Sequence, residues 1–170
     1  MWVIALETTA YSSRKDFLER LQSLLDLSNE SFKPKIVERF GLRYINRLTG
    51  QNAVNISSLV KPEIAGITAS NFKEYIRQTI NESLFIIPDG DEQIIARWGL
   101  IPEGMTFDPD ALEPIAEPSW VLDLDMSLTK NREFSVDRQI DDAQRFSERI
   151  YTFFRWAVQD DFLRHFGGEL

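Results

Sequence analysis

Polar and apolar residues alternate in "SWVLDLDMSL", residues 119 to 128, and this alternation constrains the fold strongly. Successive side chains of a β-strand point to opposite faces of its sheet. Asp123 and Asp125 therefore share one face, with Val121 in line with them. The side chains expected on the other face are Leu122, Leu124 and Met126. This pattern is typical of an antiparallel strand with one buried and one solvated face.

Two earlier segments also have strand character. Residues 2 to 9, "WVIALETT", are rich in β-formers and end in threonines. Residues 35 to 48 include "IVERFGLRYINRL", in which polar and apolar residues alternate. Gly41 in this run is a candidate for a β-bulge. We expect a short N-terminal strand and a long second strand.

Residues 72 to 87 fit two structures. They form either a helix capped by Asn71 or a strand in which polar residues alternate with isoleucines. We favour the strand, because "PDGDE" at 88 to 92 is a strong turn signal and "QIIARWGLI" after it is β-like. The sequence therefore predicts a β-hairpin.

Two amphipathic helices flank these strands. Ser12 or Ser13 is a suitable N-cap for a helix from about 13 to 27 that lays its leucines on a sheet. Ser135 or Asp137 can cap a long C-terminal helix. Between them, residues 102 to 118 hold four of the seven prolines and predict an acidic surface loop.

The order of these elements predicts one α+β domain over residues 1 to 170. We expect a mostly antiparallel sheet with the N-terminal helix and the long C-terminal helix packed on one face. A chain of 170 residues is long enough to bury one sizeable core. The other face of such a sheet is free to bind a partner or a ligand.

Composition indicates a cytoplasmic protein. The chain has no cysteine, which excludes disulfides, thiolate metal sites and a cysteine nucleophile. Its N-terminus lacks the basic leader of a signal peptide, and no window reaches the roughly 18 apolar residues of a membrane span. A single histidine, His165, excludes a multi-histidine metal site. We expect no cofactor, no metal and no catalytic residue.

The charge distribution is uneven. The formal net charge of -8 disfavours broad binding to nucleic acid. One basic strip opposes this trend, however, and it coincides with the predicted long strand: Lys33, Lys35, Arg39, Arg43 and Arg47. A nucleic-acid partner for this strip is therefore one hypothesis.

The strip contains the most informative motif, "GLRYINRL". Arg43 and Arg47 share one strand face, and Tyr44 and Asn46 share the other. Because an unpaired buried arginine is costly, Arg43 and Arg47 either reach solvent or meet acids on adjacent strands. The alternatives are a cross-strand ion network and a recognition face, since Arg, Tyr and Asn make dense hydrogen-bonded contacts.

Three carboxylates are candidates for that acidic surface: Glu7, Asp123 and Asp125. Paired carboxylates on one strand face suit a Mg²⁺ site or a general acid and base, but they also suit an ordinary solvated sheet face. A metal-dependent hydrolase at these residues is therefore a further hypothesis. Arg97 is expected on the same surface if its strand is a neighbour.

The tryptophans at 98, 120 and 156 have apolar neighbours and are expected in the core. The alternative for the last helix is an aromatic side, carried by Phe153, Phe154 and Trp156, that faces a partner. We include Phe153 and Trp156 among the candidate binding residues for this reason.

Four segments, "ALETTAYSS", "GLRYINRL", "LDLDMS" and "FFRWAVQDDF", resemble a sporadically distributed bacterial family of uncharacterised proteins with an RYINR strand motif. The resemblance covers most of the chain and implies that it corresponds to the C-terminal part of longer family members, as a natural short form or a fragment. Where the family commonly has a histidine early in the last helix, this chain has "IDDAQRF". The resemblance implies a fold and a patchy distribution, as in defence-linked or mobile genes, but no reaction.

These observations favour a non-enzymatic accessory subunit that binds itself or another protein through the open sheet or the aromatic last helix. An uncovered edge strand is the natural contact for such a subunit.

Overall fold

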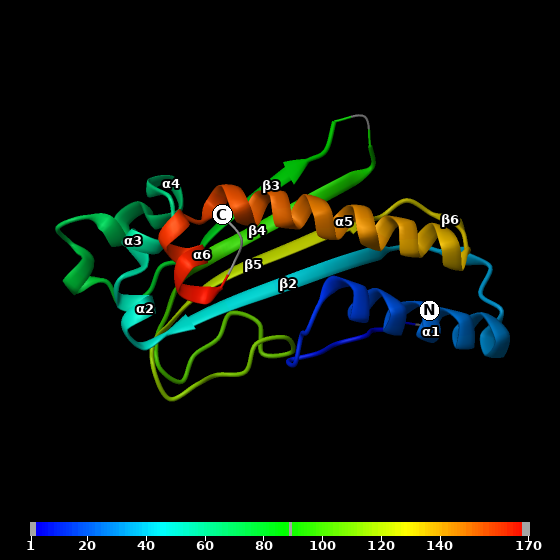
Figure 1. Ribbon diagram of the computed structural model, residues 1–170, viewed down its shortest axis with the longest axis horizontal. Helices are drawn as coiled ribbons and strands as arrows, with labels where there is room; N and C mark the ends of the chain where they lie inside the picture. Colours follow the sequence, from blue (N-terminus) through cyan, green and yellow to red (C-terminus); the bar gives the residue numbers. More distant parts are fainter. Residues whose placement is uncertain (1–2, 89, 168–170) are drawn as a thin grey trace.

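A four-stranded antiparallel sheet forms the centre of the molecule (Figure 1). The computed structural model describes residues 3–88 and 90–167. The strand order is β2-β5-β4-β3, so β2 and β3 are the two edges. The strands are β2 (Phe40–Thr49), β3 (Asn81–Ile86), β4 (Glu92–Ile101) and β5 (Ser119–Leu128). A separate pair joins β1 (Ile36–Val37) to β6 (Arg132–Glu133).

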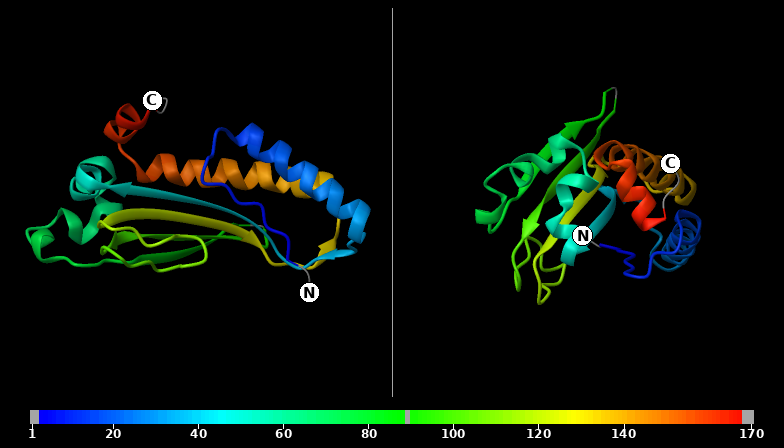
Figure 2. Two further views of the ribbon diagram at one scale, coloured as in Figure 1. Left: turned by 90° about the horizontal axis from the view of Figure 1, so that it is seen from below. Right: turned by 60° about the vertical axis from the view of Figure 1, so that its left-hand side comes forward.

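Two long helices cover one face of this sheet (Figure 2). The N-terminal helix is α1 (Arg14–Phe32) and the C-terminal helix is α5 (Val136–Ala157). Ser13 caps α1 by accepting a hydrogen bond from the Asp16 backbone N–H, and Ser135 caps α5 through the Arg138 N–H. The predicted α+β fold, with a mostly antiparallel sheet and these helices on one face, is confirmed.

The core lies between α5 and the sheet. Leu122, Leu124 and Met126 of β5 are almost fully buried, and Phe146 and Ile150 of α5 are buried with them. The predicted alternation along β5 thus places its apolar residues against the helix. Burial on this scale is the main source of stability in a domain of this size.

Short helices close one end of the sheet. They are α2 (Gly50–Val54), α3 (Ile56–Leu59), α4 (Pro62–Ala65), η1 (Gly66–Ala69), η2 (Lys73–Tyr75) and α6 (Asp160–Phe166). A β-bridge between Val60 and Val158 ties this group to the end of α5. Buried residues of this group belong to the same hydrophobic cluster as those of the sheet and α5, so the group extends the main core.

The acidic loop, residues 102–118, crosses the face of the sheet that the long helices leave open (Figure 2). Leu112 of this loop packs on Ile101 and Val121, and Phe107 and Ile45 border this small cluster. The loop therefore covers one end of the open face. The remaining part of this face is formed by the rest of β2 and β5.

Several local predictions were wrong. Residues 3 to 8 have no regular structure, and position 2 lies outside the described residues. Val3 is 81% exposed, so the β-forming composition there is not matched by packing against a strand. In the segment 72 to 87 only Asn81–Ile86 is a strand, because 3₁₀ turns precede it. Gly41 pairs in register with Ser127, without a bulge, and α1 continues to Phe32.

No helix in the described part of the chain has the length and apolar character needed to cross a membrane.

Candidate functional site

The open face of the sheet carries an ion network centred on Asp123. Arg43 of β2 donates from Nε to Asp123 Oδ1 and from Nη2 to Asp123 Oδ2, and both hydrogen bonds are 2.8 Å long. Arg97 of β4 approaches Asp123 Oδ2 at 3.5 Å. The Asp123 side chain is only 1% exposed, so these partners replace the water it has lost. The predicted cross-strand ion network exists here.

Further acids extend this network. Arg43 Nη1 also donates to Asp108 of the acidic loop over 2.7 Å, and this hydrogen bond lowers the pKa of Asp108. Arg39 Nη2 lies 3.3 Å from Asp125 Oδ2. Burial nevertheless raises the pKa of Asp125, despite the nearby arginines. The hydrogen bonds that Arg43 donates to Asp123 raise the pKa of Arg43.

Arg47 lies at the covered end of the same face. Its Nη1 donates a 2.8 Å hydrogen bond to the Glu113 backbone carbonyl, whereas Nε and Nη2 are buried without a hydrogen-bond partner among the described residues. Burial lowers the pKa of Arg47. Arg39, Arg43 and Arg47 are therefore all engaged with the protein itself. Carboxylates pair with Arg39 and Arg43 but not with Arg47, so only part of the positive charge of the strip is neutralised, and the nucleic-acid hypothesis stays a prediction.

The predicted carboxylate triad does not assemble on the sheet. Asp123 and Asp125 do share a face, but both oxygens of Asp123 accept from Arg43. Glu7 is exposed, in the irregular segment before α1, and so lies on no strand. Among residues 3–88 and 90–167, no cluster of three His, Asp or Glu side chains has an arrangement that suits a metal ion. The geometry therefore does not favour the hydrolase hypothesis.

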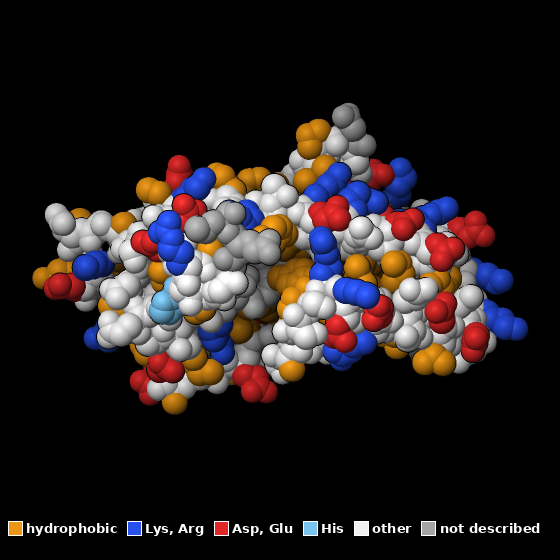
Figure 3. Space-filling model, viewed as in Figure 1, with side chains coloured by type: hydrophobic (Ala, Val, Ile, Leu, Met, Phe, Trp, Pro, Cys, Tyr) orange, Lys and Arg blue, Asp and Glu red, His pale blue; other side chains and the backbone are white. Residues whose placement is uncertain are grey.

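The β3 edge exposes apolar side chains next to Phe153 and Trp156, two predicted binding residues. Leu84, Phe85 and Ile86 are 57%, 42% and 63% exposed. The Phe85 ring meets Phe153 of α5 at 5.4 Å, and Phe153 meets Trp156 at 5.3 Å. Figure 3 shows hydrophobic side chains on this projecting hairpin.

The tryptophans divide between core and surface. Trp120 is buried in the core, and half-buried Trp98 packs against it, as predicted. Trp156 is 43% exposed, so its assignment to the core was wrong. It instead continues the apolar surface of β3, with Lys61 Nζ over its ring at 5.5 Å.

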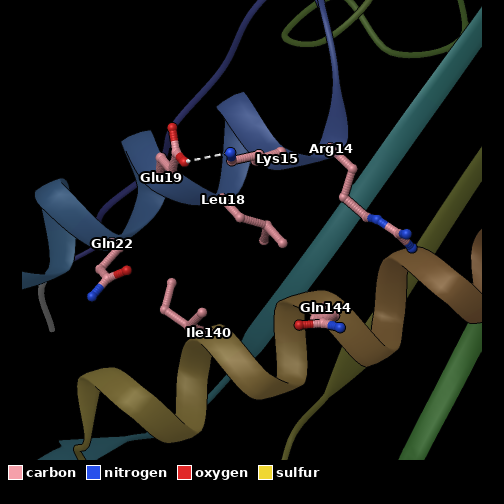
Figure 4. Close-up of a pocket in the computed structure, with 7 residues that line it drawn as sticks. All are labelled: Arg14, Lys15, Leu18, Glu19, Gln22, Ile140 and Gln144. Carbon is pink, nitrogen blue, oxygen red and sulfur yellow. Dashed lines mark ion pairs between the residues drawn. The ribbon is translucent and has the colours of Figure 1, made fainter.

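Tyr44 and Asn46 lie on the helix-covered face of β2, and both line a hollow between α1 and α5. The sequence pattern placed Tyr44 and Asn46 on the strand face opposite Arg43 and Arg47, as found, but it did not reveal this hollow. A second hollow, also between α1 and α5, has Leu18 and Ile140 in its lining (Figure 4). Lys15 on its rim pairs with Glu19 of the same helix at 3.8 Å.

Another ion network was missed altogether. Glu92, at the start of β4 and 8% exposed, accepts hydrogen bonds from Arg145 and Arg149 of α5. Asp142 pairs with Arg145 over 2.6 Å and with Arg132 of β6. The spacing of Asp142, Arg145 and Arg149 puts them on one side of α5, and this periodicity was the signal available in the sequence.

No protein-family model matches the chain, and no curated protein matches it. The resemblance based on the RYINR strand motif therefore stays a prediction.

Proposed function

We propose that the protein is a non-enzymatic binding subunit that holds a protein partner by strand addition at the β3 edge. The observation that carries this proposal is the apolar character of an edge strand: Leu84, Phe85 and Ile86 are all exposed at the rim of the sheet. Edge strands usually carry charges, prolines or bulges that prevent pairing with another chain. In β3 the one charged residue is Glu82, and Arg97 of β4 pairs with it.

The backbone of β3 suits this role. On either side of β3, the backbone N–H of Thr79 donates to the Leu100 carbonyl and the N–H of Ile87 donates to the Glu92 carbonyl. Each hydrogen bond is 3.0 Å long. Hydrogen bonds of an antiparallel ladder alternate along the strand. The N–H and C=O groups of residues 82, 84 and 86 are therefore directed away from β4, toward an incoming strand. Such main-chain hydrogen bonds supply affinity in strand addition.

A second copy of the chain offers a complementary strand. In an antiparallel pair with its two-fold axis at Leu84, Leu84 meets its own copy and Glu82 lies opposite Ile86. Like charges then do not face each other. Every outward-directed backbone group of the three residues also finds a partner in this register. The edge is thus self-complementary, as an isologous interface requires.

Light scattering on size-exclusion fractions tests the proposal. We expect the wild-type mass to rise from monomer toward dimer over micromolar concentrations. Leu84→Lys should remain monomeric, because a charge at the centre of the edge opposes pairing. Val54→Lys is the matched control, since Val54 is 69% exposed on α2, away from the edge.

A pull-down from lysate with wild type and Leu84→Lys completes the test. A partner retained by wild type and lost by Leu84→Lys supports protein binding at β3 even if the wild type is monomeric, and the second copy is then the wrong occupant. A wild-type monomer at all concentrations, with no partner lost on Leu84→Lys substitution, contradicts the proposed function. An association with defence-linked or mobile genes stays a prediction of the family resemblance.

A further inference from the structure

An aromatic groove opens on the helix-covered face of the molecule, apart from β3. It has a volume of about 380 Å³ and lies between the N-terminus of α1, β2 and α5. Three of the four tyrosines of the chain, Tyr11, Tyr44 and Tyr151, line it. Figure 3 shows hydrophobic side chains at the bottom of a hollow near the centre of this face. The volume is at the lower end of the range for small-molecule sites, about 300 to 1,000 Å³.

Rings from two sides form the walls. Tyr11 and Tyr44 meet edge to face, with centroids 5.5 Å apart and planes at 86°. From α5, Tyr151 and Phe154 are stacked with centroids 6.3 Å apart and planes at 27°. Aromatic side chains bind planar rings well, through both large apolar area and preferred edge or stacked geometry. The walls therefore select a flat, aromatic ligand.

The polar groups of the groove favour an anion. Arg14 contributes the one charged side chain among the described lining residues. Its Nη1 lies 3.6 Å from Glu148, and both side chains are about half exposed. Burial raises the pKa of Tyr44, so its phenol keeps a proton that it can donate. A ligand carboxylate could thus accept hydrogen bonds from the groove and replace Glu148 as the partner of Arg14.

We propose that this groove binds a small planar aromatic anion, such as an arenecarboxylate, with its ring among the tyrosines and its carboxylate at Arg14. The site is distinct from the β3 edge and does not depend on the proposed function. Glu148 is the built-in competitor for the same guanidinium. This gives two opposite expectations, since loss of Arg14 should weaken binding and loss of Glu148 should strengthen it.

The experiment is a titration of the full chain with 1-naphthoate, followed by NMR shifts of the tyrosine ring signals. For a ligand of this size we expect a Kd on the order of 0.1 to 1 mM. Arg14→Gln should weaken binding about fivefold, and Glu148→Gln should strengthen it about twofold, as for partly exposed charge pairs. The neutral analogue 1-naphthalenemethanol should not respond to either substitution.

Matched tyrosine variants test the aromatic walls. Tyr151→Ala should weaken naphthoate binding at least fivefold, whereas Tyr75→Ala should leave it unchanged, because Tyr75 is 81% exposed and lies outside the groove. Circular dichroism of each variant checks folding. Leu84→Lys should keep wild-type affinity, which separates this site from the β3 edge.

Three outcomes would overturn the proposal. The first is the absence of saturable binding to the folded wild type at millimolar naphthoate. The second is a failure of either control: Tyr151→Ala and Tyr75→Ala weaken naphthoate binding equally, or Arg14→Gln changes the affinities for 1-naphthoate and 1-naphthalenemethanol by the same factor. The third is loss of self-association in Tyr151→Ala with no change in naphthoate affinity, because the groove would then be a contact for a second copy.

Discussion

Asp123 is fully buried, and Arg43 donates to both of its carboxylate oxygens. Removing one partner of a buried ion pair leaves the other charge without compensation. We expect Asp123→Ala to lower the free energy of unfolding by about 3 kcal/mol, measured by urea denaturation. Asp91→Ala is the control, since the pair that Asp91 makes with Lys130 is exposed and its loss should leave the stability unchanged within error. Equal effects of the two substitutions would contradict a central role for Asp123.

Asp108 and Asp125 contact arginines on the same face, yet their pKa values shift in opposite directions. The hydrogen bond from Arg43 lowers the pKa of Asp108. The ionised Asp108 therefore contributes stability above its unfolded-state pKa, and this stability is lost as the pH falls through its folded-state pKa. Burial raises the pKa of Asp125, so the stability associated with its protonated form is lost as pH rises through its folded-state pKa.

This difference predicts opposite pH profiles for two asparagine variants. As the pH rises from about 3 to about 6, the free energy of unfolding of Asp108→Asn should fall relative to that of wild type. Over the same rise, the free energy of unfolding of Asp125→Asn should increase relative to wild type. Urea denaturation of the three proteins across this range measures both trends. Parallel profiles, or trends with the signs exchanged, would show that the two carboxylates do not differ in this way.

At the scale of elements, Glu92 joins β4 to α5 by accepting from Arg145 and Arg149. Its side chain is 10% exposed, and those of the arginines are 40% and 36% exposed. We expect Glu92→Ala to destabilise the protein by about 2 kcal/mol, less than for a fully buried pair because solvent screens the arginines. A double-mutant cycle with Arg149→Met measures the coupling. Purely additive effects would mean that this network does not hold the helix on the sheet.

The contact between β4 and the segment before β3 depends on a glycine. A Cβ atom at Gly99 would lie 1.8 Å from the Thr79 carbonyl oxygen, whereas one at Gly41 of β2 would lie 3.1 Å from the Arg39 guanidinium, the end of a long side chain that can shift. We therefore expect Gly99→Ala to cost about 2 to 3 kcal/mol and Gly41→Ala less than about 0.5 kcal/mol. Thermal or urea unfolding of both variants decides this, and a larger cost at Gly41 would contradict the packing argument.

For the whole molecule, the sequence predicted elements whose patterns are local. The pairing of β3 with β4 and the Ser135 cap of α5 depend on a few neighbouring residues, and the structure confirms both, although position 89 of the predicted turn lies outside the described residues. The alternation of β5 correctly predicted which residues face α5, but the face that was expected to be solvated is also largely buried. The segment 3 to 8 has similar β propensity but forms no strand, because a strand needs a partner that local sequence does not reveal. The same limit applies to the ion network on the sheet. The prediction that Asp123 and Asp125 meet arginines of adjacent strands could be made from the strand pattern, but the contact of Asp108 could not, because Asp108 reaches Arg43 from a loop 65 residues along the chain. The aromatic groove likewise joins residues of three separate elements.

The cytoplasmic location stays a prediction.

We expect the rates of backbone amide hydrogen exchange to follow how deeply each strand is buried in the sheet. Amides of β5 should exchange most slowly, because β5 lies between β2 and β4 and nearly all of its side chains are buried. In dilute protein, the β3 amides of Ser83 and Phe85 should be protected, while those of Glu82, Leu84 and Ile86, directed away from β4, should exchange fast.

Raising the protein concentration then links this pattern to assembly. If a second copy pairs with β3, the amides of residues 82, 84 and 86 should become protected together, and Leu84→Lys should prevent this. Protection that instead rises uniformly over the sheet would indicate global stabilisation, not edge pairing. Full protection of these three amides in dilute wild type would contradict the open edge itself, because a strand of the same chain would already cover it.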